Sequence, residues 1–336
     1  MRNMFLMAAC ASILLVSCGK DGGEGKKEEP VVQNTWPESG FSGNNYWYLS
    51  NGTVQIGVDL SRGGCVFHFS EKGTKRNLIN HYDNGRFIQQ SYYDGKTDGS
   101  VWNGKNWRWN PIQGGGWKEG TGAKIIKREK SETSIEIQTQ PVHWATCEAL
   151  PECGMTETIT LGENYAKIHY KFTNNGNGAY SHAQYDQELP AVFCDGALGT
   201  FVTYEGDAPW TGDDLTYVKN VTSVTDWPFT QALSSECWAA YLDSKGWGIG
   251  VYTPQSTGTP GEDEAANIGK VRYSAYRASG SNYPGTGPVG ASCSYFGPHA
   301  KKTIVKGFSL EYDVYLAIGT AEEIRSTFKN IHDKKL

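Results

Sequence analysis

Short segments in which apolar and polar residues alternate dominate the chain from Asn45 onward. Alternation with period two, together with β-branched and aromatic residues, predicts strands. The clearest such segments are bounded by Gly, Asn, Asp or Pro and cover residues 53–60, 134–142, 166–174, 246–254 and 308–319. Helical periodicity is confined to 320–331, where Thr320 can cap a short helix. The pattern predicts an all-β protein with few short helices, built as one large antiparallel β-sandwich. Residues 255–300, rich in Gly, Ser and Pro, are expected to form long loops.

The first seventeen residues are typical of an export signal. Arg2 supplies a positive charge, and residues 4–16 form an apolar run too short to cross a bilayer with ease. The run ends in Leu-Val-Ser followed by Cys18, which resembles a bacterial lipobox. We expect removal of residues 1–17 as a lipoprotein signal peptide and acylation of Cys18, with palmitate as one of the chains. The alternative is an ordinary secretory peptide with a chance cysteine.

Residues 18–40 are rich in Gly, Lys, Glu and Pro and are expected to be a solvated tether. The acidic, Gly-rich stretch after Cys18 is similar to surface-export signals of Bacteroidetes lipoproteins. This similarity implies a domain anchored by lipid to the outer membrane and exposed at the cell surface. The folded domain is then expected to cover residues 41–336.

Charge and aromatic content indicate which kind of ligand the chain binds. The chain has 31 Lys and Arg against 36 Asp and Glu, a net charge of −5, which argues against a nucleic-acid binder. It also contains 41 Gly, 11 Trp and 19 Tyr. Many turns and many amphipathic rings favour a β protein with a wet aromatic surface that contacts sugars.

Six cysteines remain beyond the expected signal peptide and tether, an even number that permits disulfides in an exported chain. Cys147 and Cys153 flank a short loop and are the pair that we expect to be bonded. No C-x-x-C pair supports a zinc site, and no cofactor is predicted. Acidic residues in the segments 206–207 and 212–214 are compatible with Ca²⁺, but we assign no metal.

The segment 77–93 concentrates hydrogen-bonding groups and rings. It contains Asn80, His81, Arg86 and Gln89, together with three tyrosines. Amides, acids and arginines bind sugar hydroxyls, and aromatic rings stack on the C–H faces of sugars. We interpret the segment as part of a polyol-binding site, and a hairpin with solvent-facing polar residues is the alternative.

Four tryptophans fall within residues 102–117, almost without aliphatic neighbours. Trp107 and Trp109 are therefore candidates for a platform on which pyranose rings stack. The alternative is a satellite aromatic cluster under a loop.

Two further segments carry candidate acid/base groups. If residues 185–188 are extended, Asp186 and Glu188 share one face, and repulsion between two carboxyls would raise one pKa toward neutrality. A salt-bridged exposed face is the alternative. His143 stands beside Trp144 near a loop and is a third candidate, although a lone histidine is more often structural.

These segments, taken in order, resemble the galactose-mutarotase-like superfamily of aldose epimerases and modules of glycan-degrading enzymes. Residues 80–87 are similar to its N-R-x-x-x-G-R-F motif, with Asn80 at the substrate-contacting position. Residues 110–115 are similar to its N-x-L-H-G-G motif, with Gln113 in place of the family's first histidine. The resemblance implies a β-supersandwich that handles sugars but has lost epimerase chemistry, because Gln113 cannot titrate.

The leading hypothesis is therefore an extracellular enzyme that cleaves a polysaccharide or oligosaccharide. A glycosidase would use Glu188 with Asp186 or Asp83, and this carboxyl pair favours hydrolysis. A uronate lyase would use His81 or Tyr82, with Arg86 neutralising the uronate carboxylate. A non-catalytic surface glycan-binding lipoprotein and a divergent aldose epimerase remain the alternatives.

Overall fold

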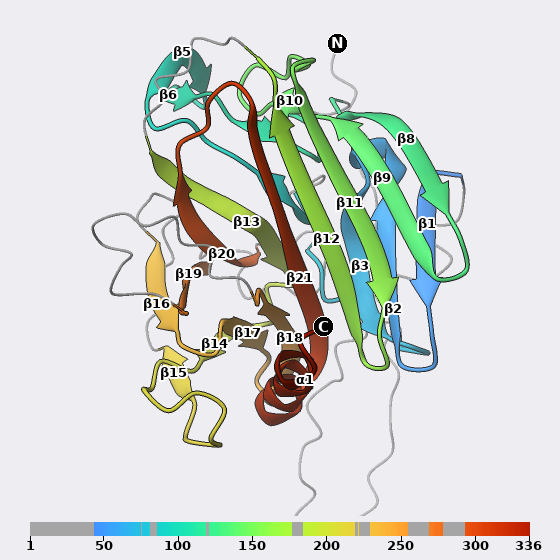
Figure 1. The fold of residues 1–336 in the computed structure, drawn as a ribbon, viewed down its shortest axis with the longest axis vertical. Coiled ribbons are helices and arrows are strands. Elements are labelled where there is room, and N and C mark those ends of the chain that lie inside the picture. Colours follow the sequence, from blue (N-terminus) through green and yellow to red (C-terminus); the bar gives the residue numbers. More distant parts are fainter. Residues whose placement is uncertain are drawn as a thin grey trace, which may run out of the picture. The chain divides into compact units, whose positions relative to one another are not determined.

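The computed structural model describes residues 44–74, 76–80, 86–118, 121–176, 184–218, 221, 229–254, 269–277 and 293–336 (Figure 1). Residues 33–336 form one compact unit. The predicted signal peptide, Cys18, Tyr82, Asp83 and His81 lie outside the described residues, so their roles stay predictions. Within the described ranges, no helix is long and apolar enough to cross a membrane.

The first of two large sheets has ten strands, in the order β1-β2-β3-β4-β13-β20-β19-β16, with β7 and β10 attached through β4. Its strands are β1 (Tyr46–Ser50), β2 (Val54–Asp59), β3 (Cys65–Glu71), β4 (Ile88–Ser91), β7 (Pro111–Ile112), β10 (Val142–His143), β13 (Tyr185–Cys194), β16 (Thr230–Ser234), β19 (Val271–Arg277) and β20 (Ser294–Lys302). Neighbouring strands run antiparallel.

The second sheet has nine strands, in the order β15-β14-β17-β18-β21-β12-β11-β9-β8, and is also antiparallel. Its strands are β8 (Lys124–Lys130), β9 (Ser134–Gln140), β11 (Cys153–Leu161), β12 (Tyr165–Asn174), β14 (Thr200–Thr203), β15 (Thr216–Val218), β17 (Trp238–Leu242), β18 (Trp247–Tyr252) and β21 (Phe308–Thr320). A hairpin of β5 (Thr97–Trp102) and β6 (Lys105–Arg108), a 3₁₀ turn η2 (Leu60–Arg62) and a helix α1 (Ala321–Lys334) complete the described elements. The all-β prediction is confirmed.

The predicted helix begins where its capping residue indicates. The Thr320 hydroxyl accepts a hydrogen bond from the Glu323 amide, and the Glu323 side chain accepts from the Thr320 amide. This reciprocal pair satisfies two backbone donors that a helix start leaves open. Ile324 and Phe328 then bury one face of α1 against β17 and β18.

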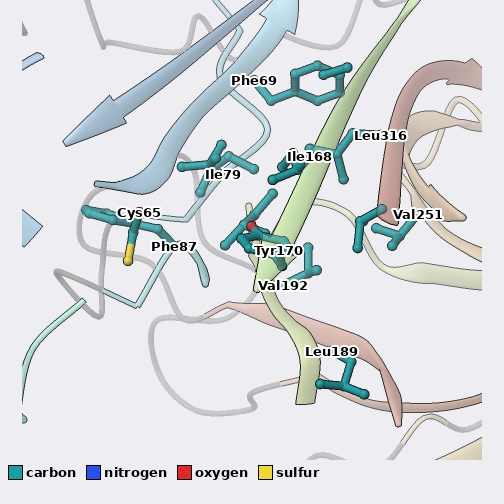
Figure 2. Close-up of a cluster of buried hydrophobic side chains, with 14 of the residues drawn as sticks. Cys65, Phe69, Ile79, Phe87, Ile168, Tyr170, Leu189, Val192, Val251 and Leu316 are labelled. Carbon is teal, nitrogen blue, oxygen red and sulfur yellow. The ribbon is translucent and has the colours of Figure 1, made fainter. Parts of the chain in front are cut away.

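The main core lies between the inward faces of the two sheets. β12 alternates strictly between buried and half-buried positions, as its sequence period requires. Ile168 and Tyr170 of β12 lie in one cluster with Phe69 of β3 and Val192 of β13 (Figure 2). Because residues of both sheets form this one cluster, each sheet turns one face toward the shared core. The other face of the ten-stranded sheet lies outside this core.

One acidic residue lies inside this core. Glu157 on β11 is fully buried, and Tyr170 and then Tyr312 stand beside it across β12 and β21. Burial raises the pKa of Glu157 to about 8, and the nearby Gln113 amide acts against the shift. No hydrogen bond of standard geometry reaches either carboxyl oxygen within the described part of the chain. Glu157 is thus mostly protonated at neutral pH.

Two expectations from the sequence are wrong. The described part of the range 255–300 holds strand β19 and most of β20, where Gly297 and Pro298 fit a ladder fixed by the neighbouring strand. Residues 255–268 and 278–292 lie outside the described residues. Cys147 and Cys153 are both free thiols, as are the other four cysteines in the described residues. The Cys153 thiol donates to the Asn174 side chain, while that of Cys147 donates to a backbone carbonyl, so the two have separate partners.

Candidate active site

A row of polar residues crosses the ten-stranded sheet. Glu188 of β13, His299 of β20 and Arg272 of β19 stand directly opposite one another on neighbouring strands. Residues paired in this way share one face of a sheet. Phe296 and Ala300 of β20 point into the core, so His299 and the row lie on the other face.

Glu188 is the centre of a hydrogen-bonded chain. The Tyr93 hydroxyl lies 2.8 Å from Glu188 Oε2, and the Tyr295 hydroxyl lies 2.5 Å from Oε1. The Tyr295 oxygen is also 3.3 Å from His299 Nε2. We call these four residues the Glu188 cluster. A carboxylate that accepts hydrogen bonds from two hydroxyls is fixed in position. It can still accept another hydrogen bond or a proton.

The pKa values of the cluster residues determine which groups donate hydrogen bonds. Burial, and then the charge of Glu188, raise the pKa values of Tyr93 and Tyr295, so both hydroxyls keep their protons and donate to the carboxylate. Burial, with the Arg272 charge adding to it, lowers the pKa of His299 to about 3. The neutral His299 ring can then donate from Nε2 to the Tyr295 oxygen, which assigns its tautomer.

Asp186 lies on the same face as Glu188, as the alternation predicts, but it has a different partner. Its carboxylate forms an ion pair with Arg272, and Lys301 stands opposite it on β20. Burial raises the pKa of Asp186, while Arg272 and Lys301 act against that shift. Asp186 and Glu188 therefore share one face, but burial, and not repulsion between the two carboxyls, raises the pKa of Asp186. One carboxylate is bound to tyrosines and the other to an arginine.

Gln187, between these two acids, points the other way and holds Tyr93. Its side-chain oxygen accepts from the Tyr93 amide at 2.6 Å, and its nitrogen donates to the Tyr93 carbonyl at 2.9 Å. Both backbone groups of Tyr93 are thus fixed by one buried amide. This arrangement places the Tyr93 hydroxyl against Glu188.

Arg86 lies beside the cluster. Its guanidinium is 4.3 Å from the centre of the Trp144 ring and 5.1 Å from that of Phe193. Phe193 is the cross-strand neighbour of Tyr295, and the Arg86 charge acts on the pKa of Tyr93. Of the predicted residues, the structure therefore brings Arg86, Asp186 and Glu188 together.

Three other predicted substrate-binding residues are almost completely buried and contact the backbone. Gln89 accepts from the Gly114 amide at 2.7 Å, and Gln113 donates to a carbonyl at 3.3 Å. The backbone N–H of Asn80 donates to the Phe193 carbonyl at 2.9 Å, and the Asn80 side chain is 1% exposed. These residues hydrogen-bond to backbone groups within the sheet and its loops. Their side chains have almost no exposed surface that could contact a sugar.

The tryptophan-rich segment forms the satellite cluster that was the alternative to a platform. The ring centre of Trp102 lies 5.1 Å from that of Trp107 and 5.8 Å from that of Trp144. These three rings pack together at the β5–β6 hairpin. Trp109 is 5% exposed and belongs to the main core. Trp117 is 47% exposed, but its indole nitrogen is bonded to the carbonyl of Ala145. Trp109 is wrong as a stacking surface, because its ring faces the interior.

His143 has a structural environment. Its Nε2 lies 2.9 Å from the Asp98 carboxylate, and its Nδ1 accepts from the Ala145 amide at 3.0 Å. Burial would raise the pKa of Asp98, but hydrogen bonds from Ser100 and His143 outweigh it and lower that pKa. Nε2 ties the β5–β6 hairpin to β10, and Nδ1 holds the turn that follows β10, so both ring nitrogens have partners in the protein.

Sequence reasoning missed Tyr295, His299 and Arg272. The signal that could have found the first two is their spacing, since Tyr295, Gly297 and His299 occupy alternate positions and must share a face. Among the described residues, no group of three or more His, Cys, Asp or Glu side chains could hold a metal ion. The chemistry of the cluster is thus that of a carboxylate, two hydroxyls and a neutral imidazole.

Gly297 leaves the space that the cluster needs. A Cβ atom at this position would lie 2.6 Å from the Pro190 carbonyl oxygen and 3.5 Å from the Tyr295 hydroxyl. Gly297→Ala is expected to destabilise the protein by about 1–3 kcal/mol, because the backbone of β13 must shift. Chemical unfolding of this variant checks the prediction against Gly52→Ala, where nothing lies within 4 Å. Equal stability of both variants would contradict it.

Comparison with known proteins gives structural neighbours only. No protein-family model matches the chain, and no curated protein matches it. A galactose mutarotase-like protein from Lactobacillus casei has 11% identity and a TM-score of 0.47 over 81% of this chain and 99% of its own. A galactose mutarotase related enzyme from Lactobacillus acidophilus has 10% identity and a TM-score of 0.46, over 81% and 97%.

A third neighbour is a 4-α-glucanotransferase from Thermococcus litoralis, with 12% identity and a TM-score of 0.46. The match covers 84% of this chain and 39% of the glucanotransferase, so this chain spans about two fifths of that enzyme. We infer function from the residues of the site.

Proposed function

We propose that the protein is a carbohydrate-active enzyme that cleaves glycosidic bonds, with Glu188 at its reaction centre. One observation carries the proposal: two tyrosine hydroxyls fix the Glu188 carboxylate beside a neutral histidine, on the sheet face that does not form the main core. Fixed carboxylates and neutral proton donors are the groups that acid/base cleavage of an acetal requires. Tyrosine and carboxylate oxygens also suit the binding of sugar hydroxyls.

Hydrolysis is the first candidate reaction. It needs a base that takes a proton from water and an acid that protonates the leaving oxygen. Glu188 is the base in this scheme, and Asp186 is the acid, since burial raises its pKa. Asp186 and Glu188 are alternate residues of one strand and therefore project from the same face, as a pair of catalytic carboxyls must. Substrate binding would have to draw Arg272 away from Asp186.

Elimination from a uronate is the second candidate, and the Tyr295–His299 pair favours it. The proton on C5 passes to the Glu188 carboxylate, the electrons of that C–H bond form a C4–C5 double bond as the C4–O bond breaks, and the leaving oxygen takes a proton from a tyrosine hydroxyl. Arg86 would neutralise the carboxylate of the sugar, as an oxyanion donor does.

Product analysis tests the proposal. The full chain is incubated with neutral and uronate-containing polysaccharides, and products are measured by mass spectrometry and ultraviolet absorbance. We expect new ends from at least one glycan. Hydrolysis adds one water to each cleaved bond, whereas elimination leaves an absorbing double bond. Glycan binding without any product would support a binding protein instead, and a change in optical rotation of free hexoses would support an epimerase.

A further inference from the structure

We propose that Tyr93, and not Tyr295, is the catalytic tyrosine of the Glu188 cluster, and that its hydroxyl gives a proton to the leaving oxygen of the glycan. Tyr295 is then a positioning residue that holds the Glu188 carboxylate. The inference rests on the proposed function, with elimination from a uronate as the reaction.

The face that carries the Glu188 cluster is more exposed at the start of β13 than along the rest of that strand. Asp186 and Glu188 are half-buried, whereas residues 189–194 are all buried. On β20, residues 294–300 are buried, and 301–302, which pair with the start of β13, are half-buried. A glycan can therefore approach Glu188 from the start of β13.

The two tyrosines lie on different sides of Glu188. The backbone of Tyr93 is held by Gln187, at the start of β13, and Tyr93 is itself half-buried. Tyr295 is the cross-strand neighbour of Phe193, in the buried part of β13, and is 0% exposed. The Tyr93 hydroxyl is thus on the side from which a glycan can approach.

The Tyr295 ring is enclosed by other rings. The centres of the Phe193 and Tyr276 rings each lie 5.0 Å from its centre, and that of Phe229 lies 5.5 Å away. A close-packed ring of this kind keeps one orientation. Tyr295 is therefore suited to holding the Glu188 carboxylate in place, and not to following a substrate.

Two neighbours assist Tyr93 as a proton donor. A hydrogen bond from Ser91 and the charge of Arg86 act to lower the pKa of Tyr93, against burial and the charge of Glu188. The Ser91 oxygen accepts from Asn110 Nδ2 at 3.3 Å, which leaves the Ser91 proton for the Tyr93 oxygen. That hydrogen bond remains, and strengthens, when Tyr93 becomes a phenolate.

The same geometry restores the site after each cleavage. Tyr93 turns its O–H bond from Glu188 to the leaving oxygen, gives up the proton, and keeps the electron pair as a phenolate. Glu188 holds the proton that it took from C5. Because the Tyr93 oxygen lies 2.8 Å from Glu188 Oε2, this proton can pass directly to the phenolate. The net change is the transfer of one proton from C5 to the leaving oxygen.

Leaving-group dependence tests the inference. Kinetics of the full chain are measured on the uronate glycan that the wild type cleaves, and on the same uronate carrying 4-nitrophenol at C4, whose oxygen can leave without a proton. Tyr93→Phe should lower kcat by roughly a hundred- to ten-thousandfold on the glycan, but by less than about tenfold on the nitrophenyl substrate. Tyr295→Phe should lower kcat by the same factor on both, because both need Glu188 as the base.

The control is Tyr217→Phe, which changes an exposed tyrosine of β15 and should leave both rates unchanged. Thermal melting shows whether each variant is folded. An equal loss on both substrates for Tyr93→Phe, or dependence on the leaving group in Tyr295→Phe instead, would overturn the inference. Products of hydrolysis from the wild type would overturn it too, yet leave the proposed function intact. Failure of the wild type to cleave any glycan would contradict the proposed function and the inference together.

Discussion

Glu188→Gln is expected to lower kcat/KM by about a thousandfold on whichever glycan the wild type cleaves. Glutamine keeps the shape of the side chain and can still accept a hydroxyl proton, but it cannot take a proton from water or substrate. Both candidate reactions need the charge of Glu188 near the breaking bond. Steady-state kinetics on the purified full chain measure the loss.

Two further variants make this result specific. Tyr295→Phe removes one hydroxyl donor to Glu188 and is expected to cost roughly ten- to a hundredfold, the worth of a hydrogen bond to a charged group. Glu311→Gln removes an exposed carboxylate of β21 that pairs with Lys171, and it should stay within about twofold. Full activity of folded Glu188→Gln would place the reaction elsewhere on the molecule.

Glu157→Gln is expected to stabilise the protein at pH 7 by roughly 3 kcal/mol. In the folded chain Glu157 titrates at about 8, against an ordinary value of 4.5. At pH 7 the unfolded chain is therefore stabilised, relative to the folded chain, by releasing a proton that the folded chain retains. Glutamine has no such proton to release and is close in shape to the neutral acid.

The sign of the pH dependence follows. The folded pKa is raised, so the wild type holds its full stability from this residue below pH 4.5 and loses it as the pH rises toward 8. The groups that face Glu157 are Cys65, Tyr170, Tyr312 and Gln113, and the pKa values of the thiol and both phenols are raised by burial. These three groups stay neutral over that interval, so Glu157 is the group in its own surroundings that titrates.

Urea unfolding at pH 5, 7 and 9 measures the effect. The stability difference between Glu157→Gln and the wild type should grow from pH 5 to pH 7 and level off above pH 8. Glu136→Gln, which changes a half-buried surface residue of β9, is the matched control and should show no such growth. A difference that does not vary with pH would mean that Glu157 is charged in the folded protein.

The local features of the fold could be predicted from the sequence, because each depends on a short period. Alternation identified β12 and β21, and Thr320 marked the start of α1. Alternation also placed Asp186 and Glu188 on one face. β13 continues past Pro190, and its pairing with β20 resumes after a register shift between Glu188 and Val192.

The partners of these residues could not be predicted, since pairing depends on register between distant strands. Glu188 and Tyr295 are separated by 107 positions, and nothing in either strand specifies the other. Trp107 and Trp109 have the same chemistry in sequence, yet the fold leaves the first half-buried under a hairpin and places the second in the core. Burial of that kind is decided by the whole sheet.

The position of β20 and β21 in the strand order has a consequence for biosynthesis. β20 lies between β13 and β19, and β21 lies between β12 and β18, so each sheet is joined across its interior by one of the last two described strands. The ten-stranded sheet is complete only after Lys302 has been translated, and the nine-stranded sheet only after Thr320. Until then these neighbouring strands present edges without their native partners, and such edges favour aggregation.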